Sequence, residues 1–459
     1  MNPRRFRLDA STRRPDDGRV LIAGSPLRLF TLGAGGVRVV EAIERGDTPP
    51  AGHEPLTDRL LDAGAIHPVI DLVPVDGALL TVVVPTLDTT PHHRPGRCRT
   101  IVVDDASAVP VQVDGAQVVR LPRNAGPGAA RNAGLAEVTT PYVAFVDADV
   151  DISEDDLLAL AAHLDDPRVA LVAPRVLGHP NGTGTLARYE QMRSPLDLGP
   201  APARVAPTTR VAYVPAAVLV CRTEAVRAVG GFDQALRYGE DVDLVWRLHE
   251  AGWRCRYEPA VQARHDTRRT LRAWLGQRYR YGTSAAPLAA RHPGALAPVR
   301  MSGWSAAAWV PALCGLPVVG ALVAAGTTVA LVRKLRTVPA SECVRLAGLG
   351  HLFAGRLLAG TLTRAWWPLA VVAALCSRRA RRTLLVAAAI TVATSWRDDR
   401  RDDRPDERPD DGGAPLDPVR YTALRLADDA AYGAGVWAGS LAARRLGALL
   451  PSFEAWPPH

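Results

Sequence analysis

Short apolar runs alternate with amphipathic stretches in the first half of the chain. The runs are rich in valine and predict buried strands at residues 79–85, 99–104, 117–121 and 142–146. A helix is expected between the last two runs, at about residues 128–136. Strands that alternate with helices predict a parallel sheet whose ligands bind beyond the carboxyl ends of the strands. Residues 76–300 are therefore expected to form one α/β domain.

The connection between the first two strands, residues 86–98, is unusually short. Parallel strands need a crossover of a dozen or more residues, usually a helix, and Pro91 and Pro95 oppose a helix here. The adjacent His92 and His93 resemble a metal-binding pair, but the sequence favours an exposed loop at this position.

The first 75 residues follow a different pattern. A hairpin is expected at residues 19–29, an amphipathic helix at 34–44 and a second helix around 56–61. This mixture of short strands and helices resembles the winged-helix modules that recognise precursor peptides in the biosynthesis of modified peptides. That resemblance implies a precursor peptide or a pathway protein as a partner. A plain structural extension of the α/β domain explains the same pattern.

Residues 301–396 are apolar and differ from the rest of the chain. Residues 301–332 contain no charged residue and end at a basic cluster. About 20 apolar residues suffice to cross a bilayer, and basic flanks favour the cytoplasmic side. Pro311 and Pro317 also permit a broken helix that lies in the membrane plane. We therefore expect membrane-associated helices in contact with lipid, with the catalytic domain on the cytoplasmic side of the cell membrane. A helical domain that packs on itself or in a dimer is the alternative.

Two further segments complete the chain. Residues 397–418 are rich in Asp, Arg and Pro with few apolar residues, so a disordered linker is expected there. Residues 419–459 carry apolar residues between charged ones and predict a last helix.

The composition and net charge of the chain argue against some classes of function. The chain has 459 residues, enough for two or three domains, and a formal net charge of +8 that is almost entirely due to arginine. The sequence has no dense basic strip interleaved with aromatic residues, so nucleic acid is not an expected partner. The six cysteines are scattered without the spacing of a metal or redox motif, and the first residues lack the apolar core of a signal peptide. A reducing compartment is expected.

Two carboxylates, Asp147 and Asp149, follow the apolar run at 142–146. Residues two apart on an extended chain point to the same side, so both carboxylates leave the strand end together. A hard divalent cation binds such oxygen ligands and bridges to substrate phosphates. By itself this D-x-D pattern is weak, because a solvated strand end carries the same residues.

Five motifs in a fixed order strengthen the interpretation. They are V-V-V-P-T at 82–86, V-V-D-D-A-S at 102–107, N-x-G-x-x-x-A-R-N-x-G at 124–134, F-V-D-A-D at 145–149 and G-E-D-V-D-L at 239–244. The series resembles the family 2 glycosyltransferases, which have a GT-A fold, over about residues 78–268. The resemblance implies transfer of a sugar from a nucleotide diphosphate donor, usually with inversion at the anomeric carbon.

The resemblance also implies roles for the residues of the first four motifs. Asp105 would accept a hydrogen bond from the base, with Asp104 beside it, and Arg131 would lie near the donor diphosphate. Asp147 would face the ribose, and Asp149 would hold Mg²⁺ or Mn²⁺ on the diphosphate. The nucleotide pocket would be lined by Pro85 and Thr86. For Asp104 the open alternative is a turn with Ser107.

The fifth motif is expected to supply the catalytic residues. In the resembled family the Asp of the E-D pair is the general base, here Asp241, and Glu240 would contact the acceptor. A charged helix start is the alternative, because carboxylates in the first turn meet the helix dipole favourably. A His at the place of His265 is a metal ligand in many relatives, although a lone histidine usually has no special role.

Residues 277–281 resemble the Q-x-x-R-W element with which processive relatives hold the terminal sugar. Gln277 and Arg280 offer donors to hydroxyls or diphosphate, and Tyr281 replaces the Trp, with an aromatic face that can stack on a sugar ring. A solvated or lipid-facing basic helix surface explains the residues equally well.

The architecture as a whole resembles the family of mycofactocin-pathway glycosyltransferases. That resemblance implies UDP-glucose as the donor and a peptide-derived redox cofactor as the acceptor, which receives a short β-linked glucose chain. A lipid or cell-envelope polysaccharide acceptor is the alternative within the wider family. Two alternatives come from other classes: a nucleotidyltransferase, although its Gly-rich loop should follow the first strand where Pro85-Thr86-Leu87 stands, and a non-catalytic membrane scaffold.

Overall fold

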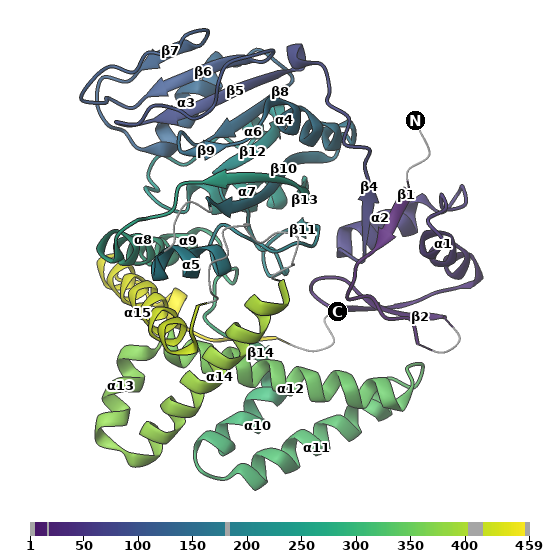
Figure 1. Ribbon diagram of the computed structural model, residues 1–459. Helices are drawn as coiled ribbons and strands as arrows, with labels where there is room; N and C mark the ends of the chain where they lie inside the picture. The colour runs from purple at the N-terminus through teal and green to yellow at the C-terminus, as the bar shows by residue number, and fades with distance from the viewer. Residues whose placement is uncertain (1–4, 16–17, 180–183, 403–415, 455–459) are drawn as a thin grey trace. The chain divides into compact units, whose positions relative to one another are not determined.

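The computed structural model describes residues 5–15, 18–179, 184–402 and 416–454 (Figure 1). Their contacts divide the chain into two compact units. Among the described residues, the first unit comprises 5–7 and 58–270, and the second comprises the described parts of 8–57, 271–401 and 416–454. Each unit is described by itself.

A mixed nine-stranded sheet forms the centre of the first unit, in the order β11-β13-β10-β12-β8-β5-β6-β7, with β9 paired to β13. The pairs β5–β6, β5–β8, β6–β7 and β10–β13 are parallel, and β12 runs antiparallel to both β8 and β10. The strands are β5 (Leu80–Thr86), β6 (Arg99–Asp104), β7 (Gln117–Arg120), β8 (Tyr142–Val146), β9 (Val150–Asp151), β10 (Val169–Gly178), β11 (Ala203–Val205), β12 (Val218–Arg222) and β13 (Arg254–His265). The predicted α/β sheet is confirmed, with antiparallel strands added from the second half of the unit.

Alternate residues of β5 face opposite sides of the sheet. Val82 and Val84 pack in the apolar core that includes Leu157 and Leu158 of α4, whereas a side chain at Gly134 of α3 would collide with Val83. The two helices therefore cover different faces, and only glycine allows α3 to lie this close to β5. The helices of the unit are α3 (Pro127–Glu137), α4 (Glu154–Ala161), α5 (Thr185–Met192), α6 (Thr223–Ala228) and α7 (Glu240–Glu250).

The connection between β5 and β6 contains no helix, as expected, but its histidines do not lie in an exposed loop. His93 is buried, and its Nε2 lies 3.5 Å from Oγ1 of Thr100. His92 is half-buried, because its N–H donates to the carbonyl of Ala148 (2.8 Å) and draws the connection onto the sheet. The expectation of an exposed loop was therefore wrong. Burial lowers the pKa of His93.

The N-terminal segments form the predicted hairpin and helices. β2 (Val20–Ala23) pairs antiparallel with β3 (Arg28–Thr31), and α1 (Ala34–Glu44) and α2 (Glu54–Ala63) follow. β1 (Arg5–Leu8) pairs with β4 (Ile66–Val69). The winged-helix interpretation stays a prediction.

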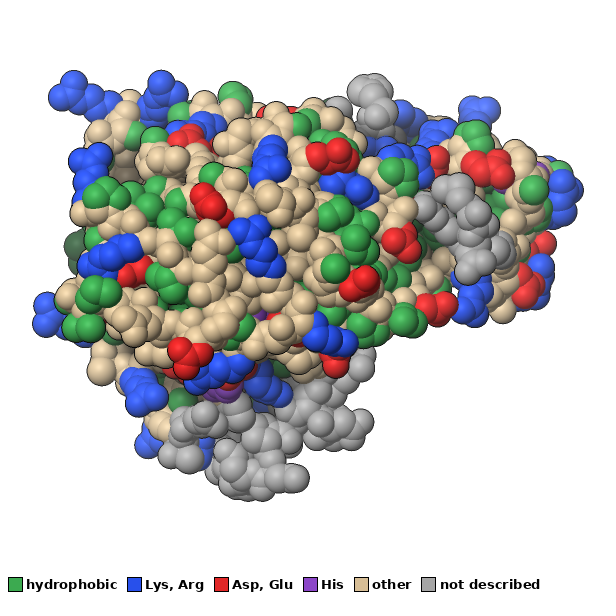
Figure 2. Space-filling view, turned by 90° about the horizontal axis from the view of Figure 1, so that it is seen from above, with side chains coloured by type: hydrophobic (Ala, Val, Ile, Leu, Met, Phe, Trp, Pro, Cys, Tyr) green, Lys and Arg blue, Asp and Glu red, His purple; other side chains and the backbone are tan. Residues whose placement is uncertain are grey.

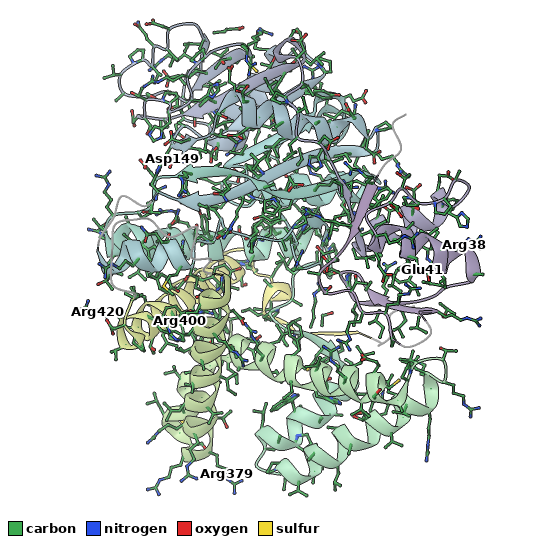
Figure 3. The ribbon with its side chains drawn as sticks, turned by 45° about the vertical axis from the view of Figure 1, so that its right-hand side comes forward. Arg38, Glu41, Asp149, Arg379, Arg400 and Arg420 are labelled. Carbon is green, nitrogen blue, oxygen red and sulfur yellow. The ribbon has the colours of Figure 1, made fainter. Side chains whose placement is uncertain are left out.

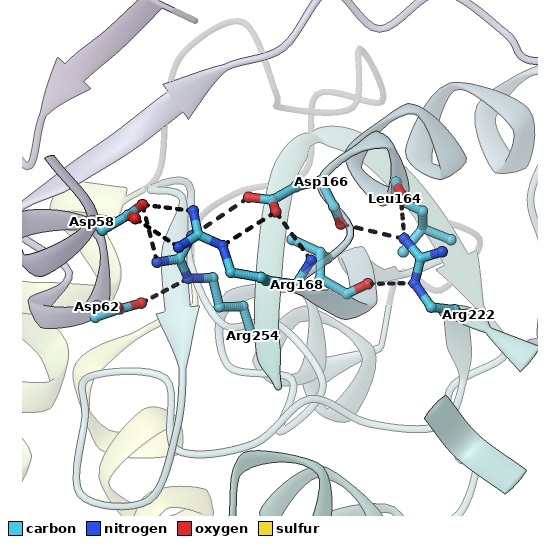
Figure 4. A network of polar contacts seen from close by, with 8 residues as sticks. Asp58, Asp62, Leu164, Asp166, Arg168, Arg222 and Arg254 are labelled. Atoms are coloured by element: carbon cyan, nitrogen blue, oxygen red, sulfur yellow. Dashed lines mark hydrogen bonds and ion pairs between the residues drawn. The ribbon is translucent and has the colours of Figure 1, made fainter. Parts of the chain in front are cut away.

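An ionic network joins the end of α2 to the sheet of the first unit (Figure 4). Arg168 donates twice to Asp58 of α2, at 2.6 and 2.7 Å. Arg254, which begins β13, reaches both Asp58 and Asp62, and it also lies 3.5 Å from Asp166. Because the Arg254 side chain is only 11% exposed, these pairs are less screened than ordinary surface ion pairs.

Helices dominate the second unit. They are α8 (Leu271–Thr283), α9 (Ala285–Arg291), α10 (Gly303–Leu313), α11 (Pro317–Lys334), α12 (Ala340–Thr363), α13 (Trp367–Cys376), α14 (Arg378–Asp402) and α15 (Pro418–Ala442). A short parallel pair, β14 (Arg300–Ser302) and β15 (Ser452–Glu454), accompanies them. The backbones of α8 and α15 nearly touch, because a side chain on Gly435 would lie 1.9 Å from the carbonyl oxygen of Tyr279.

The uncharged stretch 301–332 is broken rather than continuous. α10 ends before Gly315, whose φ of 86° turns the chain back into α11, and the two helices pack closely at Gly320. Among the described residues α11 alone is long and apolar enough to cross a bilayer, and the bent pair α12 and α13 meets the same test together. Large apolar side chains on these helices are exposed, Val318 at 71% and Leu322 at 68%.

The predicted linker overlaps with a helix. α14 continues to Asp402, and carboxylates of its last turns pair with Arg356 and Tyr421 of the same unit. These partners let a charge-rich sequence stay helical. Residues 403–415 lie outside the described residues.

Candidate active site

The carboxyl ends of β5 and β6 lie side by side at one edge of the sheet. Thr86, the last residue of β5, pairs with Asp104, the last residue of β6, and the N–H of Asp105 donates to the carbonyl of Thr86 (2.9 Å). Pro85 precedes this pair and is half-buried. The parallel register therefore brings the four residues predicted to bind the nucleotide to one place.

Backbone N–H groups and an arginine fix the carboxylate of Asp104. Its carboxylate accepts hydrogen bonds from the N–H groups of Ser107 (2.8 Å) and Val111 (3.3 Å) and pairs with Arg120. Burial acts to raise its pKa, but these hydrogen bonds and the arginine charge together hold the pKa below its usual value. The turn with Ser107 that the sequence allowed is present, and a nucleotide-binding role for Asp104 stays a prediction.

Asp105 faces the loop that enters α3. Oδ1 accepts from the N–H of Ala125 (2.7 Å) and Oδ2 from that of Gly126 (2.8 Å). Gly126 has a φ of 91°, a conformation that disfavours any side chain, so the glycine of the third motif is needed to present this N–H. Each carboxylate oxygen keeps a further lone pair for a ligand donor.

Arg131 is the centre of the site. It lies on α3, is buried, and donates to Oε1 of Glu240 (2.8 Å) and to Oδ1 of Asp147 (2.6 Å). Its guanidinium also lies 5.3 Å from the ring centre of Phe232. Burial acts to lower the pKa of Arg131, but the charges of Asp147 and Glu240 outweigh burial and raise it. The permanent cation therefore joins the D-x-D motif to the E-D motif.

Glu240 and Asp241 begin α7. Burial raises the pKa of Glu240 to about 7, helped by the charge of Asp241 and opposed by Arg131. Burial also raises the pKa of Asp241, although backbone N–H groups oppose the rise. Oδ1 of Asp241 accepts from Val242 (2.8 Å), and Oδ2 accepts from Ala216 (3.1 Å). Two fixed donors orient this carboxylate, and a raised pKa near a cation is typical of functional sites.

Two supporting residues have no role in the sequence prediction. The amide of Asn132 exchanges hydrogen bonds with the backbone of Phe232, at 2.7 and 2.9 Å. Arg247 of α7 pairs with Asp243 (2.7 Å) and donates to the carbonyl of Gly231 (2.7 Å). Both hold the Gly-Gly-Phe-Asp segment next to Arg131. Asn132 stands within the third motif and Arg247 three residues beyond the fifth, and these positions were the only signal in the sequence.

Asp149 lies between β8 and β9, and His265 ends β13, which pairs with β9. Figure 3 labels Asp149 at the edge of the sheet. The N–H of Asp266 donates to the carbonyl of Asp149 (3.2 Å), which ties the two segments together. Burial and the charge of Asp147 raise the pKa of Asp149. Burial lowers the pKa of His265, whose Nδ1 lies 3.1 Å from the carbonyl of Asp266.

Carboxylate and imidazole side chains are ligands that divalent cations accept, and the role of Asp149 and His265 as metal ligands stays a prediction. A neutral imidazole whose Nδ1–H donates to a carbonyl presents its Nε2 lone pair, which is the usual arrangement of a ligating histidine. Among the described residues, Nε2 of His265 approaches Oγ of Ser194 at 3.4 Å. A cation would also offset the repulsion from the Asp147 carboxylate, which is one cause of the raised pKa of Asp149.

The remaining predicted residues lie on α8, in the second unit. Nε2 of Gln277 donates to the hydroxyl of Tyr281 (3.1 Å), and Oε1 of Gln277 accepts from Arg278 (3.2 Å). Arg278 is buried and pairs with Asp428 of α15 (3.1 Å). Arg280 follows on the same helix. The roles of Gln277, Arg280 and Tyr281 in chain extension stay predictions.

Charged side chains are mixed in sign on the face shown in Figure 2, where arginines and carboxylates are interspersed. The described side chains on this face form no continuous cationic strip.

Comparisons with known proteins identify the family of the chain. Residues 142–394 match the model of the Glycosyl transferase family group 2. Two pre-mycofactocin glycosyltransferases of Mycobacterium tuberculosis, from strains CDC 1551 / Oshkosh and H37Rv, are each 41% identical over 97% of this chain and 97% of their own length.

Solved structures with similar chains include a mannosyltransferase, PcManGT from Pyrobaculum calidifontis, in complex with GDP-Man and Mn²⁺. It is 17% identical, with 77% of this chain and 94% of that chain covered and a TM-score of 0.36. TarS of S. aureus is 18% identical, with 45% of this chain and 65% of that chain covered and a TM-score of 0.33. On the family match and the 41% identity over almost the whole length, the chain belongs to the family 2 glycosyltransferases and is a homologue of the pre-mycofactocin glycosyltransferases.

Proposed function

We propose that this glycosyltransferase is inverting, uses Mg²⁺ or Mn²⁺, and transfers glucose from UDP-glucose to the peptide-derived redox cofactor of the mycofactocin pathway. We further propose that it adds several glucose units in a short β-linked chain. The observation that carries the proposal is the buried cluster in which Arg131 joins Asp147 to Glu240, beside Asp241. The 41% identity to pre-mycofactocin glycosyltransferases supports the acceptor.

Asp241 acts as the general base in this proposal. Its carboxylate takes the proton of the acceptor hydroxyl while the hydroxyl oxygen bonds to the anomeric carbon. The nucleoside diphosphate leaves from the opposite face with the electron pair of the broken C–O bond. The raised pKa makes Asp241 a stronger base than an exposed aspartate, and a positioned base contributes about 10²–10⁴-fold to the rate.

The donor lies against the other members of the cluster. Arg131 is close to the diphosphate and Asp147 faces the ribose, while Pro85, Thr86 and Asp105 hold the uracil end. Asp149 and His265 hold the divalent ion, which when bound neutralises charge that develops on the departing diphosphate. Glu240 faces the acceptor, with its charge set by the competition between burial and Arg131.

We also propose that the protein associates with the cell membrane through the second unit, with the catalytic site on the cytoplasmic side. The support is the exposed apolar surface of α10, α11 and α13, on which Val310, Val318, Leu322, Leu369 and Leu375 are each more than half exposed. Exposed apolar surface of this extent marks an interaction site for protein or membrane. The same observation favours a second candidate function, transfer to a lipid or cell-envelope polysaccharide acceptor.

The experiment that tests the function is a transfer assay with purified full-length protein, UDP-glucose and Mn²⁺. One arm offers the peptide-derived cofactor precursor, and the other offers a polyprenyl phosphate lipid. Mass spectrometry should show successive hexose additions to the precursor. Hexose on the lipid alone would favour the second candidate. An unmodified precursor together with rapid use of another nucleotide sugar would contradict the donor assignment.

A further inference from the structure

Three side chains outside the proposed donor site, those of His92, Asp151 and His179, come together with the spacing of metal ligands. Nδ1 of His92 lies 3.2 Å from Oδ1 of Asp151, and Nε2 of His179 lies 2.7 Å from Oδ2 of the same carboxylate. One ligand atom of each residue lies within 4.8 Å of the other two. Ligand atoms bound at about 2.0–2.2 Å to one tetrahedral ion are roughly 3.3 Å apart, so small side-chain shifts bring all three onto one cation.

Backbone hydrogen bonds place the three residues from different parts of the sheet. Asp151 ends β9, which pairs with the last residues of β13. The N–H of His179, just after β10, donates to the carbonyl of His265 at the end of the same β13 (2.9 Å). His92 is anchored by its bond to the carbonyl of Ala148 (2.8 Å). The cluster is therefore fixed by the fold and is not a chance meeting of mobile surface side chains.

The present partners do not satisfy the cluster. Nδ1 of His92 is buried and has no hydrogen bond of acceptable geometry among the described residues, although a carboxylate oxygen lies close to it. A buried polar atom without a partner is costly, and native structures rarely leave one without a reason. The Asp151 side chain is 50% exposed, so an ion from solvent can reach the site.

We propose that His92, Asp151 and His179 bind a second divalent ion, Zn²⁺ or a similar transition metal, with a ligand set that shares no residue with Asp149 and His265. Two imidazoles and one carboxylate with an open position are a recurring set for zinc and for other first-row metals. Mg²⁺ prefers oxygen ligands and keeps its waters, so it fits this site less well.

The ion links the connection between β5 and β6 to neighbouring strands of the sheet. That connection, residues 87–98, lacks a helix that would pack on the sheet, and its central residue His92 already bonds to Ala148, the residue between Asp147 and Asp149. An ion that is bound by His92, Asp151 and His179 links the same segment to β9 and to the end of β10. The ion thereby limits the motion of the segment after β8 that carries Asp147 and Asp149.

Metal binding by the full-length protein, without nucleotide, tests the proposal. After treatment with a chelator, the protein is titrated with Co²⁺, whose visible absorption reports nitrogen and oxygen ligation, and then with Zn²⁺ in competition. The variants are His92→Ala, His179→Ala and Asp151→Asn, with His53→Ala as a control histidine outside the cluster. Hydrogen exchange of residues 87–98 with and without Zn²⁺ gives a second readout, and circular dichroism checks that each variant is folded.

Wild type and His53→Ala should bind one Co²⁺ with visible bands that Zn²⁺ abolishes. Each cluster variant should bind at least about tenfold more weakly, since loss of even an outer partner of a ligand costs 10–100-fold. Zn²⁺ should slow exchange of residues 87–98 in wild type but not in His179→Ala. Unchanged affinity in both histidine variants would overturn the proposal. Loss of the bands in Asp149→Ala alone would also overturn the proposal, because the ion would then lie at the donor site. That result would leave the proposed function standing.

Discussion

Replacing Arg131 with methionine removes the cation that joins the two carboxylate motifs while keeping a side chain of similar length. Asp147 and Glu240 each lose a charged hydrogen bond, of 2.6 and 2.8 Å, and little water can replace it at Glu240, whose side chain is only 9% exposed. Breaking a buried ion pair from one side costs about 3–5 kcal/mol. Because natural domains are stable by only about 5–15 kcal/mol, the variant should unfold at much lower denaturant than wild type.

The loss of stability caused by Arg131→Met should increase with pH. The pKa of Glu240 is about 7 in the folded protein although Arg131 acts to lower it, so removing Arg131 raises it further. A carboxyl whose folded pKa lies above its unfolded pKa, about 4.3 for Glu, contributes stability that is fully present when the pH is below the unfolded pKa. This contribution is lost as the pH rises through the folded pKa. The destabilisation by Arg131→Met should therefore be larger at pH 8 than at pH 6.

Urea unfolding at both pH values, followed by circular dichroism, measures these differences. Arg131→Lys should recover only part of the stability, since one ammonium cannot reproduce two fixed guanidinium bonds. Arg38→Met, at an exposed position of α1 (Figure 3), is the control and should leave stability and transfer unchanged. Equal stability of Arg131→Met and wild type at pH 8 would refute the central role given to this arginine.

Three further predictions concern the donor, the chain and the membrane. Asp149→Ala should lose Mn²⁺-dependent UDP binding in calorimetry, and undiminished binding would remove it from the metal site. Tyr281→Ala should shorten the product ladder seen by mass spectrometry more than it slows the first transfer; the chain-extension role fails if the length distribution is unchanged or if wild type adds a single sugar. Full-length protein should sediment with membranes, and Val318→Glu with Leu322→Glu, at exposed positions of α11, should shift it towards the supernatant. A wild type that stays in the supernatant without detergent contradicts the membrane proposal.

Periodicity located the first four strands of the sheet and the helix α3 closely, whereas it gave no expectation for β9 to β13. The strand at 99–104 and the helix at 34–44 have the predicted bounds, and α3 begins and ends within one residue of expectation. These elements were readable because burial imposes a local pattern on each of them: a continuous apolar run for a strand between two helix layers, and apolar positions at helical spacing for α1. Of the two prolines that permitted a broken helix at 301–332, Pro317 stands at the break as the first residue of α11, whereas Pro311 lies inside α10.

Contacts between distant residues were not readable in the same way. Arg131 and Glu240 are 109 residues apart, and no local pattern indicates that they touch. The burial of His93 and the placing of His92 depend on the carbonyl of Ala148, which only the folded sheet brings there. The continuation of α14 to Asp402 likewise depends on partners such as Tyr421 on another helix. Family motifs indicated the site residues, whereas their partners came from the fold.

The central claim, that Asp241 is the base of a sugar transfer from a nucleotide donor, is tested most directly by Asp241→Asn. Oδ1 of Asp241 accepts from Val242 and Oδ2 accepts from Ala216, so the amide keeps one of these hydrogen bonds and loses the other. Leaving one buried donor without its partner costs about 1–3 kcal/mol, so the site should stay folded and bind UDP with Mn²⁺ as wild type does. Transfer from UDP-glucose should fall by about 10²–10⁴-fold. Calorimetry and a transfer assay on the same preparation measure both quantities. An Asp241→Asn variant that binds UDP and transfers sugar at the wild-type rate would contradict the account.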